Sequence, residues 1–312
     1  MVLLGRHVSI AGGLKNALDI SVALQCTAMQ IFVTNPRTWQ LGPLDEQSAS
    51  EFRSEMKSTG IVTVAHMPYL PNISSSKSDI FAKSVKSLAD NISRCSSLGI
   101  VYLVVHMGSH MGNGKKIAIS NIVSAVEEAL EVKSGTHILL ENEAGHRNSV
   151  GDTVNDMTEV YDTVGEGRLG FCLDTCHLYA AGYDITDHEV LDRIFEEINV
   201  DNVHAIHIND AKFGLGSHKD RHANIGYGHI GTEGFGRFLS YKGIRSKIFI
   251  PFAEASYISA DMRFDIPIYS LWGSSIATFA PDSCRDITID FVALDFPTPL
   301  SPTITVWGFI PS

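Results

Sequence analysis

The chain has 312 residues, 44% of them hydrophobic, which is enough for one large domain or two ordinary ones. No apolar run approaches the roughly 18 to 20 residues of a membrane helix and the N-terminus shows no signal-peptide pattern, so we expect a cytoplasmic protein without a membrane partner. The formal charge of −11 argues against nucleic acid as a partner, but it leaves out any metal cations held by the thirteen histidines, so charge alone does not decide the partner.

Short runs rich in Val, Ile and Leu recur along the chain and predict eight β-strands. They cover residues 6–11, 28–34, 61–66, 102–108, 137–143, 169–174, 203–210 and 247–254. Nearly continuous apolar runs are typical of strands buried on both faces, as in a parallel sheet, and the gaps between them leave room for crossover helices. Helical spacing of apolar residues is visible at 16–26, 81–99 and 115–132. Eight such units predict the α/β class and a closed (β/α)8 barrel, the TIM barrel.

The composition of the chain changes after residue 254. The remaining 58 residues hold six of the eleven prolines and contain no Lys, Glu, His, Asn or Gln. Because proline interrupts helices, no amphipathic helix is expected there. We therefore expect a single barrel domain, residues 1–254, and an atypical tail, residues 255–312, in place of the last barrel helix. An altered reading frame from about Arg245 onward is one hypothesis for this tail.

Polar side chains gather where the predicted strands stop. Histidines or carboxylates follow five consecutive strands, at His66, His106, His110, Glu141, Glu143, Asp174, His177, His207 and Asp210. In a TIM barrel the carboxyl ends of the strands carry the chemistry. One histidine at a strand end is most often structural, but five consecutive polar strand ends predict a functional site.

The segment FCLDTCHLYAAGYD combines two thiols with a carboxylate and an imidazole. Cys172 and Cys176 stand four positions apart, which is not the Cys-x-x-Cys spacing of thioredoxin-type sites, and no second pair of closely spaced cysteines completes a zinc ribbon. We therefore expect both thiols to pack in the interior. Asp174 and His177 remain, either as a hydrogen-bonded pair or as metal ligands.

Asp220 and His222 are two positions apart, so in an extended chain they project to the same side and can bind one cation. Alone they are more typical of a solvated loop. Together with the strand-end residues they form a set of imidazoles and carboxylates without a thiolate, which suits Zn²⁺ or Mn²⁺ in open, catalytic coordination. The eight residues of the set are His66, His106, Glu141, Asp174, His177, His207, Asp220 and His222.

Eight ligands are too many for one ion, so two or three ions are expected in one pocket. Closely spaced metals activate water near neutral pH and neutralise the oxygens of a phosphate under attack, which favours phosphodiester cleavage. Sugar isomerisation remains an alternative, because metals held at strand ends also polarise carbonyl groups.

Nine motifs between Gly5 and Gly231 closely resemble, in order and spacing, the endonuclease IV family of apurinic/apyrimidinic (AP) endonucleases. They are GRHVSIAGGL, VTNPRTW, HMPYL, HMGSH, LENEAG, CLDTCHLYAAGYD, HINDAK, DRHANIG and GHIG. Each motif alone is weak, whereas the ordered set is highly specific. The resemblance implies a (β/α)8 barrel hydrolase of base excision repair that cleaves the phosphodiester 5′ to an abasic site in duplex DNA. The products would be a 3′-hydroxyl and a 5′-deoxyribose phosphate.

The resemblance also assigns three zinc ions per chain, with Mn²⁺ as an alternative at one site, and it makes Glu141 a bridging and catalytic residue. The ligand sets of the first, second and third zinc would be His66 with His106, Glu141 with Asp174 and His207, and His177 with Asp220 and His222. Three Zn²⁺ would add six positive charges where the DNA phosphate must lie, which eases the objection from net charge.

Three positions match family residues that open the duplex: Arg37 in NPRTW, and Tyr69 and Leu70 in HMPYL. A cation with aromatic and aliphatic wedges can replace the stacking lost at a flipped nucleotide. Without the resemblance, Tyr69 and Leu70 would be interpreted as ordinary loop anchors. The expected partner is duplex DNA with abasic sites, bound by a monomer.

Glu254 matches a ninth ligand, a glutamate of the eighth strand that completes the second zinc in the family, and it is also a candidate catalytic residue. Here the segment IPFAE is one residue shorter between proline and glutamate than the family pattern, and a slip of one residue turns a strand side chain to the opposite face. Two alternatives therefore stay open. One is a metal-dependent sugar isomerase or epimerase, and the other is a damaged-DNA binder whose catalysis is impaired by the eighth strand.

Overall fold

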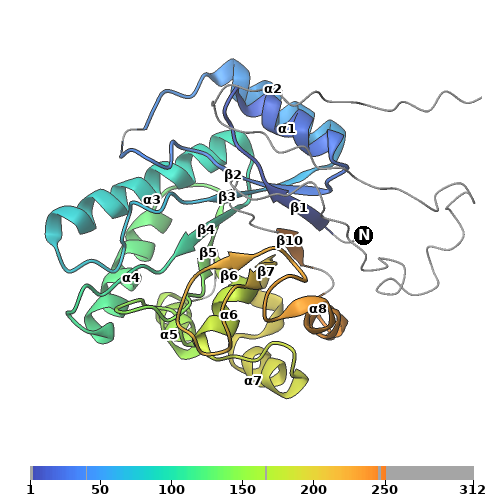
Figure 1. The fold of residues 1–312 in the computed structure, drawn as a ribbon. Helices are drawn as coiled ribbons and strands as arrows, with labels where there is room; N and C mark the ends of the chain where they lie inside the picture. Colours follow the sequence, from blue (N-terminus) through green and yellow to red (C-terminus); the bar gives the residue numbers. More distant parts are fainter. Residues whose placement is uncertain (1–2, 40, 166, 245–246, 251–312) are drawn as a thin grey trace, which may run out of the picture. The chain divides into compact units, whose positions relative to one another are not determined.

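The computed structural model describes residues 3–39, 41–165, 167–244 and 247–250, and eight of their strands close into a parallel barrel (Figure 1). The first strand pairs with both the second and the last, which closes the ring. In the order around the barrel the strands are β1 (Leu3–His7), β2 (Ala28–Phe32), β3 (Val62–His66), β4 (Tyr102–His106), β5 (His137–Glu141), β6 (Leu169–Asp174), β7 (Val203–His207) and β10 (Ile248–Ile250). The predicted TIM barrel is confirmed.

Helices alternate with the barrel strands (Figure 1). They are α1 (Leu14–Ala23), α2 (Glu46–Thr59), α3 (Ser78–Leu98), α4 (Lys115–Leu130), α5 (Val154–Val164), α6 (Thr175–Ala181), α7 (His188–Ile198), the short 3₁₀ helix η1 (Val200–Asn202) and α8 (Gly231–Ser240). The three helices predicted from apolar spacing correspond to α1, α3 and α4, within a few residues at each end. Among the described helices, none combines the length and the hydropathy of a membrane span.

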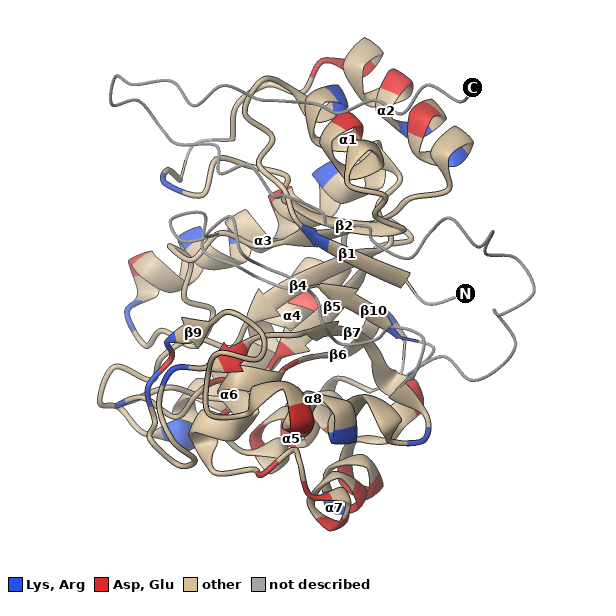
Figure 2. Ribbon diagram, turned by 45° about the vertical axis from the view of Figure 1, so that its right-hand side comes forward, with Lys and Arg blue, Asp and Glu red and all other residues tan. Residues whose placement is uncertain are grey.

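The sequence of α3 illustrates why these segments are helical. Val85, Leu88 and Ile92 recur at helical spacing and are buried on one face, and Gly99 ends the helix in the left-handed region at φ 70°. In α2, the side chain of Asp45 accepts a hydrogen bond from the backbone N–H of Ser48 and caps the first turn. Figure 2 shows acidic and basic residues along α2 and α7, on the outer layer of the fold.

Inside the barrel, a polar layer of side chains lies above an apolar one. The apolar cluster consists of Ala28, Val64, Val104, Leu139, Cys172, Ala205, Ile248 and Ile250. Side chains two positions further along a strand point to the same side of the sheet. For the strands β2 to β7 these are Gln30, His66, His106, Glu141, Asp174 and His207. The candidate ligands therefore stand on rigid strands at the carboxyl end of the barrel.

Among β1 to β7, the strands β2, β4 and β5 end two residues earlier than predicted, and the bounds of β1 and β7 were wrong by three residues or more. The first strand covers Leu3–His7 rather than 6–11, because the chain leaves the sheet ahead of Gly12 and Gly13, which adopt φ values of 86° and 105°. The seventh strand ends at His207 rather than at 210. Residues Asp210–Ala211 form a separate short strand, β8, which pairs antiparallel with β9 (His222–Ala223).

For the end of the chain, the sequence predicts an eighth strand at 247–254 and an atypical tail at 255–312. Of the predicted eighth strand, residues 247–250 are described, and Ile248–Ile250 form β10. Glu254 and the tail 255–312 lie outside the described residues. The domain boundary after residue 254 and the replacement of the last helix therefore stay predictions.

Candidate metal centre

All eight predicted ligands gather at the carboxyl end of the barrel. Five of them are at most 2% exposed, namely His66, Glu141, Asp174, His177 and His207. The side chains of His106 and His222 are about one fifth exposed, and that of Asp220 is 44% exposed. The cluster is thus buried in the barrel and opens to solvent on the side of these three residues.

Glu141 occupies the middle of the cluster. Its Oε2 lies 3.2 Å from Nε2 of His66 and 3.3 Å from Nε2 of His106, and its Oε1 lies 2.6 Å from Nδ1 of His207. The strand register explains the contact between His106 and Glu141, since these residues are paired neighbours on β4 and β5. Each carboxylate oxygen therefore faces different imidazoles, as a bridge between two ions requires.

A second part of the cluster surrounds His177 and His222. Oδ1 of Asp220 lies 3.2 Å from Nε2 of His177 and 3.3 Å from Nε2 of His222. Oδ2 of Asp174 lies 3.7 Å from Nε2 of His222 and 3.9 Å from Nδ1 of His207, which joins this part to Glu141. Four sets have donor atoms within 4.8 Å of one another, and three of them consist of imidazoles and carboxylates alone: His66 with Glu141 and His207, Glu141 with Asp174 and His177, and His177 with Asp220 and His222.

Four of the imidazoles turn one nitrogen away from the centre toward an oxygen acceptor. The contacts are Nδ1 of His66 to the carbonyl of Met67 at 2.7 Å, Nδ1 of His106 to Oε1 of Glu143 at 2.9 Å, Nδ1 of His177 to the carbonyl of Asn142 at 2.9 Å, and Nε2 of His207 to Oε1 of Gln30 at 2.8 Å. Each of these nitrogens donates its hydrogen, so in the neutral imidazole the other nitrogen presents a lone pair to the centre.

The residues fit a metal for a simple electrostatic reason. A lone pair on imidazole and a carboxylate oxygen are both acceptors, so at about 3.2 Å a proton or a metal ion must lie between them. Nε2 of His177 is buried and forms no hydrogen bond within the described part of the chain, although Asp220 is close. That arrangement suits a ligand atom aimed at an ion.

Without a metal ion, protons on the imidazoles balance the negative charge of the carboxylates, and the pKa values are shifted accordingly. Burial lowers the pKa of His66, and burial alone would lower that of His106 too, but the charges of Glu141 and Glu143 raise the pKa of His106 to about 9. Although burial opposes ionisation, His106 and His207 hold the pKa of Glu141 well below its ordinary value. Glu141 is therefore ionised and ready for cations.

In the second part of the cluster, around His177 and His222, opposite charges shift the pKa values in the same way. Burial opposes protonation of His177, but Asp174 and Asp220 raise its pKa well above the ordinary value. Burial likewise opposes ionisation of Asp220, and His177 with His222 lowers its pKa nonetheless. Carboxylate and imidazole thus stabilise each other's charged forms across both parts of the cluster.

Asp210 positions the segment that carries Asp220 and His222. This fully buried carboxylate accepts hydrogen bonds from five backbone N–H groups, those of Ala211, Gly226, Gly228, Ile230 and Gly231. A Cβ atom at Gly228 would lie 2.4 Å from Oδ1 of Asp210, so glycine is required there. We call residues 212–231 the β8–α8 loop, and Asp210 ties its end to its beginning.

Sequence reasoning missed the residues that hold the ligands in place. Asn142 bonds the backbone of Asp174 at both N–H and carbonyl, and Nδ2 of Asn209 donates to Oδ2 of Asp174 at 2.6 Å. Gln30 fixes the ring of His207. For two of them the available signal was position, because Asn142 adjoins Glu141 in LENE and Asn209 follows His207 by two positions in HIND. Gln30 is a single polar residue inside an apolar strand and gave no such signal.

The two cysteines are buried, as expected for packing thiols. Burial raises the pKa of Cys172 to about 11 and raises that of Cys176 as well. Sγ of Cys176 lies near Asp174 and His222 at a distance that a metal could span, but the thiol donates to the carbonyl of Arg221 at 3.6 Å. A protonated thiol with its own acceptor supports packing rather than metal binding.

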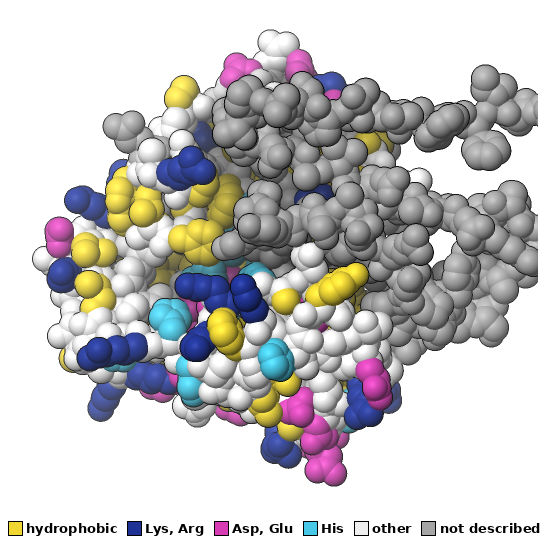
Figure 3. All heavy atoms as spheres, in the orientation of Figure 1, with side chains coloured by type: hydrophobic (Ala, Val, Ile, Leu, Met, Phe, Trp, Pro, Cys, Tyr) yellow, Lys and Arg dark blue, Asp and Glu magenta, His cyan; other side chains and the backbone are white. Residues whose placement is uncertain are grey.

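The predicted DNA-contacting residues lie on exposed loops. Tyr69 and Leu70 are 55% and 44% exposed, and the ring of Tyr69 lies 5.5 Å from that of His66 and 5.3 Å from that of His106. Arg37 lies in a turn where its N–H donates to Oδ1 of Asn35. Figure 3 shows basic, histidine and hydrophobic side chains near one another on one face.

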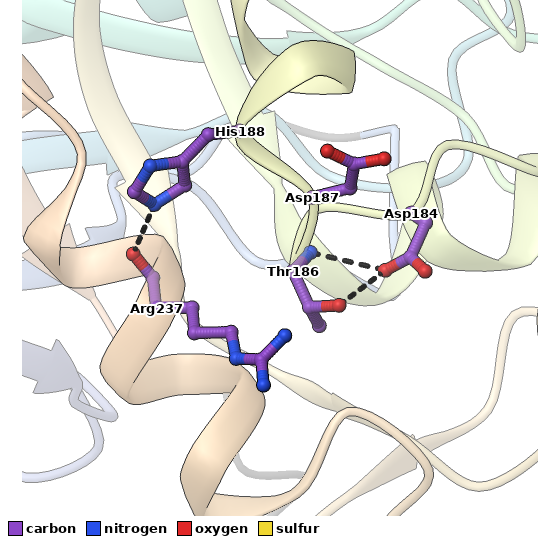
Figure 4. A pocket seen from close by; sticks show the side chains of 5 residues that line it. All are labelled: Asp184, Thr186, Asp187, His188 and Arg237. Carbon is purple, nitrogen blue, oxygen red and sulfur yellow. Dashed lines mark hydrogen bonds between the residues drawn. The ribbon is translucent and has the colours of Figure 1, made fainter.

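A separate surface hollow of about 510 Å³ lies between the start of α7 and α8 (Figure 4). It is lined by Asp184, Thr186, Asp187, His188 and Arg237. Its polar groups bond to one another, Thr186 to Asp184 and the ring of His188 to the carbonyl of Arg237. None of these residues belongs to the cluster around Glu141.

Known proteins resemble this chain over most of its length. A family profile described as xylose isomerase-like TIM barrel matches residues 18–254. A probable endonuclease 4 of Methanoculleus marisnigri is 43% identical over 253 residues, covering 78% of this chain and 90% of that protein. A probable endonuclease 4 of Nitrosopumilus maritimus is 41% identical over 246 residues, covering 76% of this chain and 88% of that protein.

Solved structures agree in fold. The crystal structure of endonuclease IV from Thermus thermophilus matches with a TM-score of 0.73 at 35% identity, covering 80% of this chain and 92% of that one. A D-tagatose 3-epimerase-like protein matches with a TM-score of 0.62 at 20% identity, covering 80% of this chain and 90% of that one, which shows the shared barrel alone. The resemblance in the motifs is confirmed: the chain belongs to the endonuclease IV family of AP endonucleases, DNA-cleaving hydrolases built on a xylose isomerase-like TIM barrel.

Proposed function

We propose that the chain is a zinc-dependent endonuclease that cleaves duplex DNA 5′ to abasic sites and leaves a 3′-hydroxyl and a 5′-deoxyribose phosphate, in base excision repair. The observation that carries the proposal is that three imidazoles face the carboxylate oxygens of Glu141 at 2.6 to 3.3 Å, an arrangement that metal cations between the donor atoms would satisfy. The proposed ligands are His66 and His106 at the first ion, Glu141 as bridge with Asp174 and His207 at the second, and His177, Asp220 and His222 at the third.

The donor set supports zinc, because imidazole and carboxylate ligands without thiolate are typical of open, hydrolytic zinc sites. When bound, the zinc ions supply a nucleophile at neutral pH and positive charge against the phosphate oxygens. The chain's own part is to hold the ligand atoms still, and Glu141 is the proposed catalytic residue that spans two ions. Glu254, outside the described residues, stays the proposed ninth ligand and second catalytic carboxylate.

The loops around the cluster support duplex DNA as the partner. The exposed ring of Tyr69 lies beside the rings of His66 and His106, and Leu70, the next residue, is also exposed. Arg37 adds an exposed cation in the turn formed by NPRTW. Apolar wedges with a cation can take the place of bases that are unstacked at a flipped nucleotide. We propose that these three residues open the duplex at the abasic site.

The decisive experiment uses a duplex oligonucleotide with one abasic site. The zinc-loaded chain should nick the damaged strand once, on the 5′ side, and leave an end that a polymerase extends, because the end carries a 3′-hydroxyl. The same duplex without the abasic site is the control. Absence of incision at full metal content would refute the enzymatic proposal. The zinc content of the same sample tests whether each chain binds three ions.

The two alternatives are separated by simple readouts. The epimerase-like neighbour shares the fold at 20% identity, whereas the two relatives above 40% identity are named probable endonuclease 4, so a sugar substrate has no specific support here. An impaired damaged-DNA binder would retain the abasic duplex without nicking it and would be indifferent to Glu254→Ala. Mn²⁺ at one site, the monomeric state and a cytoplasmic location stay predictions.

A further inference from the structure

The four imidazoles with a described outward hydrogen bond do not have equivalent acceptors. His66 and His177 donate to backbone carbonyls, and His207 donates to an amide oxygen. His106 instead donates to the carboxylate of Glu143, at 2.9 Å. One imidazole of the proposed first zinc thus has an ionic partner, while the other three have neutral ones.

Glu143 is placed for this contact by the end of β5. It follows Glu141 by two positions, and its backbone N–H donates to the carbonyl of Gly151 at 2.9 Å, which fixes the chain locally. Its side chain is 8% exposed, and within the described part of the chain its carboxylate is hydrogen-bonded to His106. Burying a carboxylate costs free energy unless a positive or strongly donating group accompanies it, so a role in packing alone is a poor explanation.

The geometry separates Glu143 from direct ligation of the ion at His106. Glu143 contacts Nδ1, whereas Nε2, on the other edge of the ring, lies 3.3 Å from Oε2 of Glu141 in the centre. An ion bound at Nε2 would therefore be within reach of Glu141 as well, whereas Glu143 lies on the opposite edge of the ring. This is the order carboxylate, histidine, metal that fixes a ligand's tautomer and raises its basicity.

We propose that Glu143 is a positioning residue of the first zinc site, which holds His106 as the Nδ1–H tautomer and strengthens Nε2 as a ligand through its negative charge. The proposal rests on the proposed zinc centre and deepens it. Its specific consequence is that the affinity for one ion depends on a residue that does not touch that ion.

The test compares Glu143→Ala and Glu143→Gln with Glu127→Gln, an exposed carboxylate on α4. Zinc affinity is measured on the full chain by competition with a coloured chelator, together with zinc content. Glu143→Ala should weaken one of the bound zincs by about 10- to 100-fold and leave the others in place. Glu143→Gln keeps an oxygen acceptor but loses the charge, so its loss should be smaller, and Glu127→Gln should match the unaltered chain.

A second readout separates positioning from a merely structural role. In the zinc-loaded chain, nitrogen NMR should show the Nδ1–H of His106 exchanging slowly with solvent because Glu143 accepts it, and this exchange should become faster in Glu143→Ala. Unchanged zinc affinity in Glu143→Ala overturns the proposal, and so does a variant that is destabilised equally with and without zinc while its affinity stays the same.

Failure of the proposal differs from failure of the proposed function. A chain that nicks abasic duplex with zinc, but whose Glu143→Ala variant binds zinc normally, refutes the role of Glu143 alone. A chain that binds zinc, loses affinity in Glu143→Ala and never nicks refutes the endonuclease and keeps the role of Glu143. The near-isosteric Gln variant keeps the test valid where the Ala variant folds poorly.

Discussion

His106 and its neighbours determine how the centre responds to pH at the scale of single residues. Against the effect of burial, Glu141 and Glu143 raise the pKa of His106 to about 9, above the ordinary value of 6.5. A raised pKa in the folded state means that protonation stabilises the fold, fully below about pH 6.5 and no longer above about pH 9. The metal-free chain therefore depends on protons where the loaded chain would depend on zinc.

We expect the free energy of unfolding of the chelated chain to fall as pH rises from about 6.5 to 9, because His106 loses its proton in that window. Glu141 does not contribute there, since its pKa is lowered and it titrates in acid. Zinc affinity should rise over the same window, because the ligands must be unprotonated. Urea unfolding with and without chelator measures both, and a flat or rising stability of the chelated chain contradicts this account of the site.

Tyr69 provides a test of substrate contact that leaves the metal centre intact. Its ring is exposed beside His66 and His106, so Tyr69→Ala should weaken binding of the abasic duplex by about 1 to 3 kcal/mol, roughly 5- to 150-fold, the scale of one base stacked on an aromatic ring. Tyr69→Phe keeps the ring and serves as the control. Equal binding by all three chains would remove Tyr69 from the interface.

The candidate ligands could be identified from the sequence more readily than the residues that hydrogen-bond to them. His66, His106 and Glu141 could be found because strand ends of a TIM barrel are a known place for chemistry, and motifs fix their order. Gln30 could not, since a single polar residue in an apolar run has no distinguishing pattern until the barrel brings it to 2.8 Å from His207. Its role exists only in the closed fold.

The β8–α8 loop is the element on which the third proposed ion depends. Asp220 and His222 belong to the β8–α8 loop, which is held in its middle by the pairing of β8 with β9 and at its end by the carboxylate of Asp210. Five backbone donors around one buried carboxylate make that end rigid. A precise ligand pair is thereby built on a segment that would otherwise be mobile.

We expect Asp210→Asn to lower the free energy of unfolding by about 1 to 3 kcal/mol, because an amide offers fewer acceptors to the five N–H groups and adds a donor among them. The zinc content should also fall by one ion, that of Asp220 and His222. Asp162→Asn, an exposed residue of α5, is the matched control. Urea unfolding and metal analysis check the two effects, and a variant with full zinc content and normal stability would contradict the role given to Asp210.

Elements were predictable where local pattern determines them. Apolar runs indicated the barrel strands, and helical spacing indicated α3 and α4, because both depend on residues a few positions apart. The end of β7 was missed because it depends on Asp210 reaching Gly226 and Gly231, sixteen and twenty-one residues later. Such a contact leaves no signal in the segment HIND itself.

The whole molecule combines an acidic composition with a proposed DNA substrate. With 24 basic and 35 acidic side chains the chain carries −11, and repulsion from DNA is the expected result for the metal-free state. The proposed ions place positive charge at the one point where a phosphate must enter. We therefore expect chelation to weaken binding of the abasic duplex as well as to stop incision, which a binding assay with and without chelator would show.

The central claim is that zinc bound by this cluster makes the chain an endonuclease for abasic sites. Its most direct test is a titration of zinc into the metal-free chain, in which bound ions and 5′ incision of an abasic duplex are measured on the same samples. The account predicts that incision is absent without zinc and returns as the third equivalent binds. Full incision by the metal-free chain, or none with three ions bound, would contradict it.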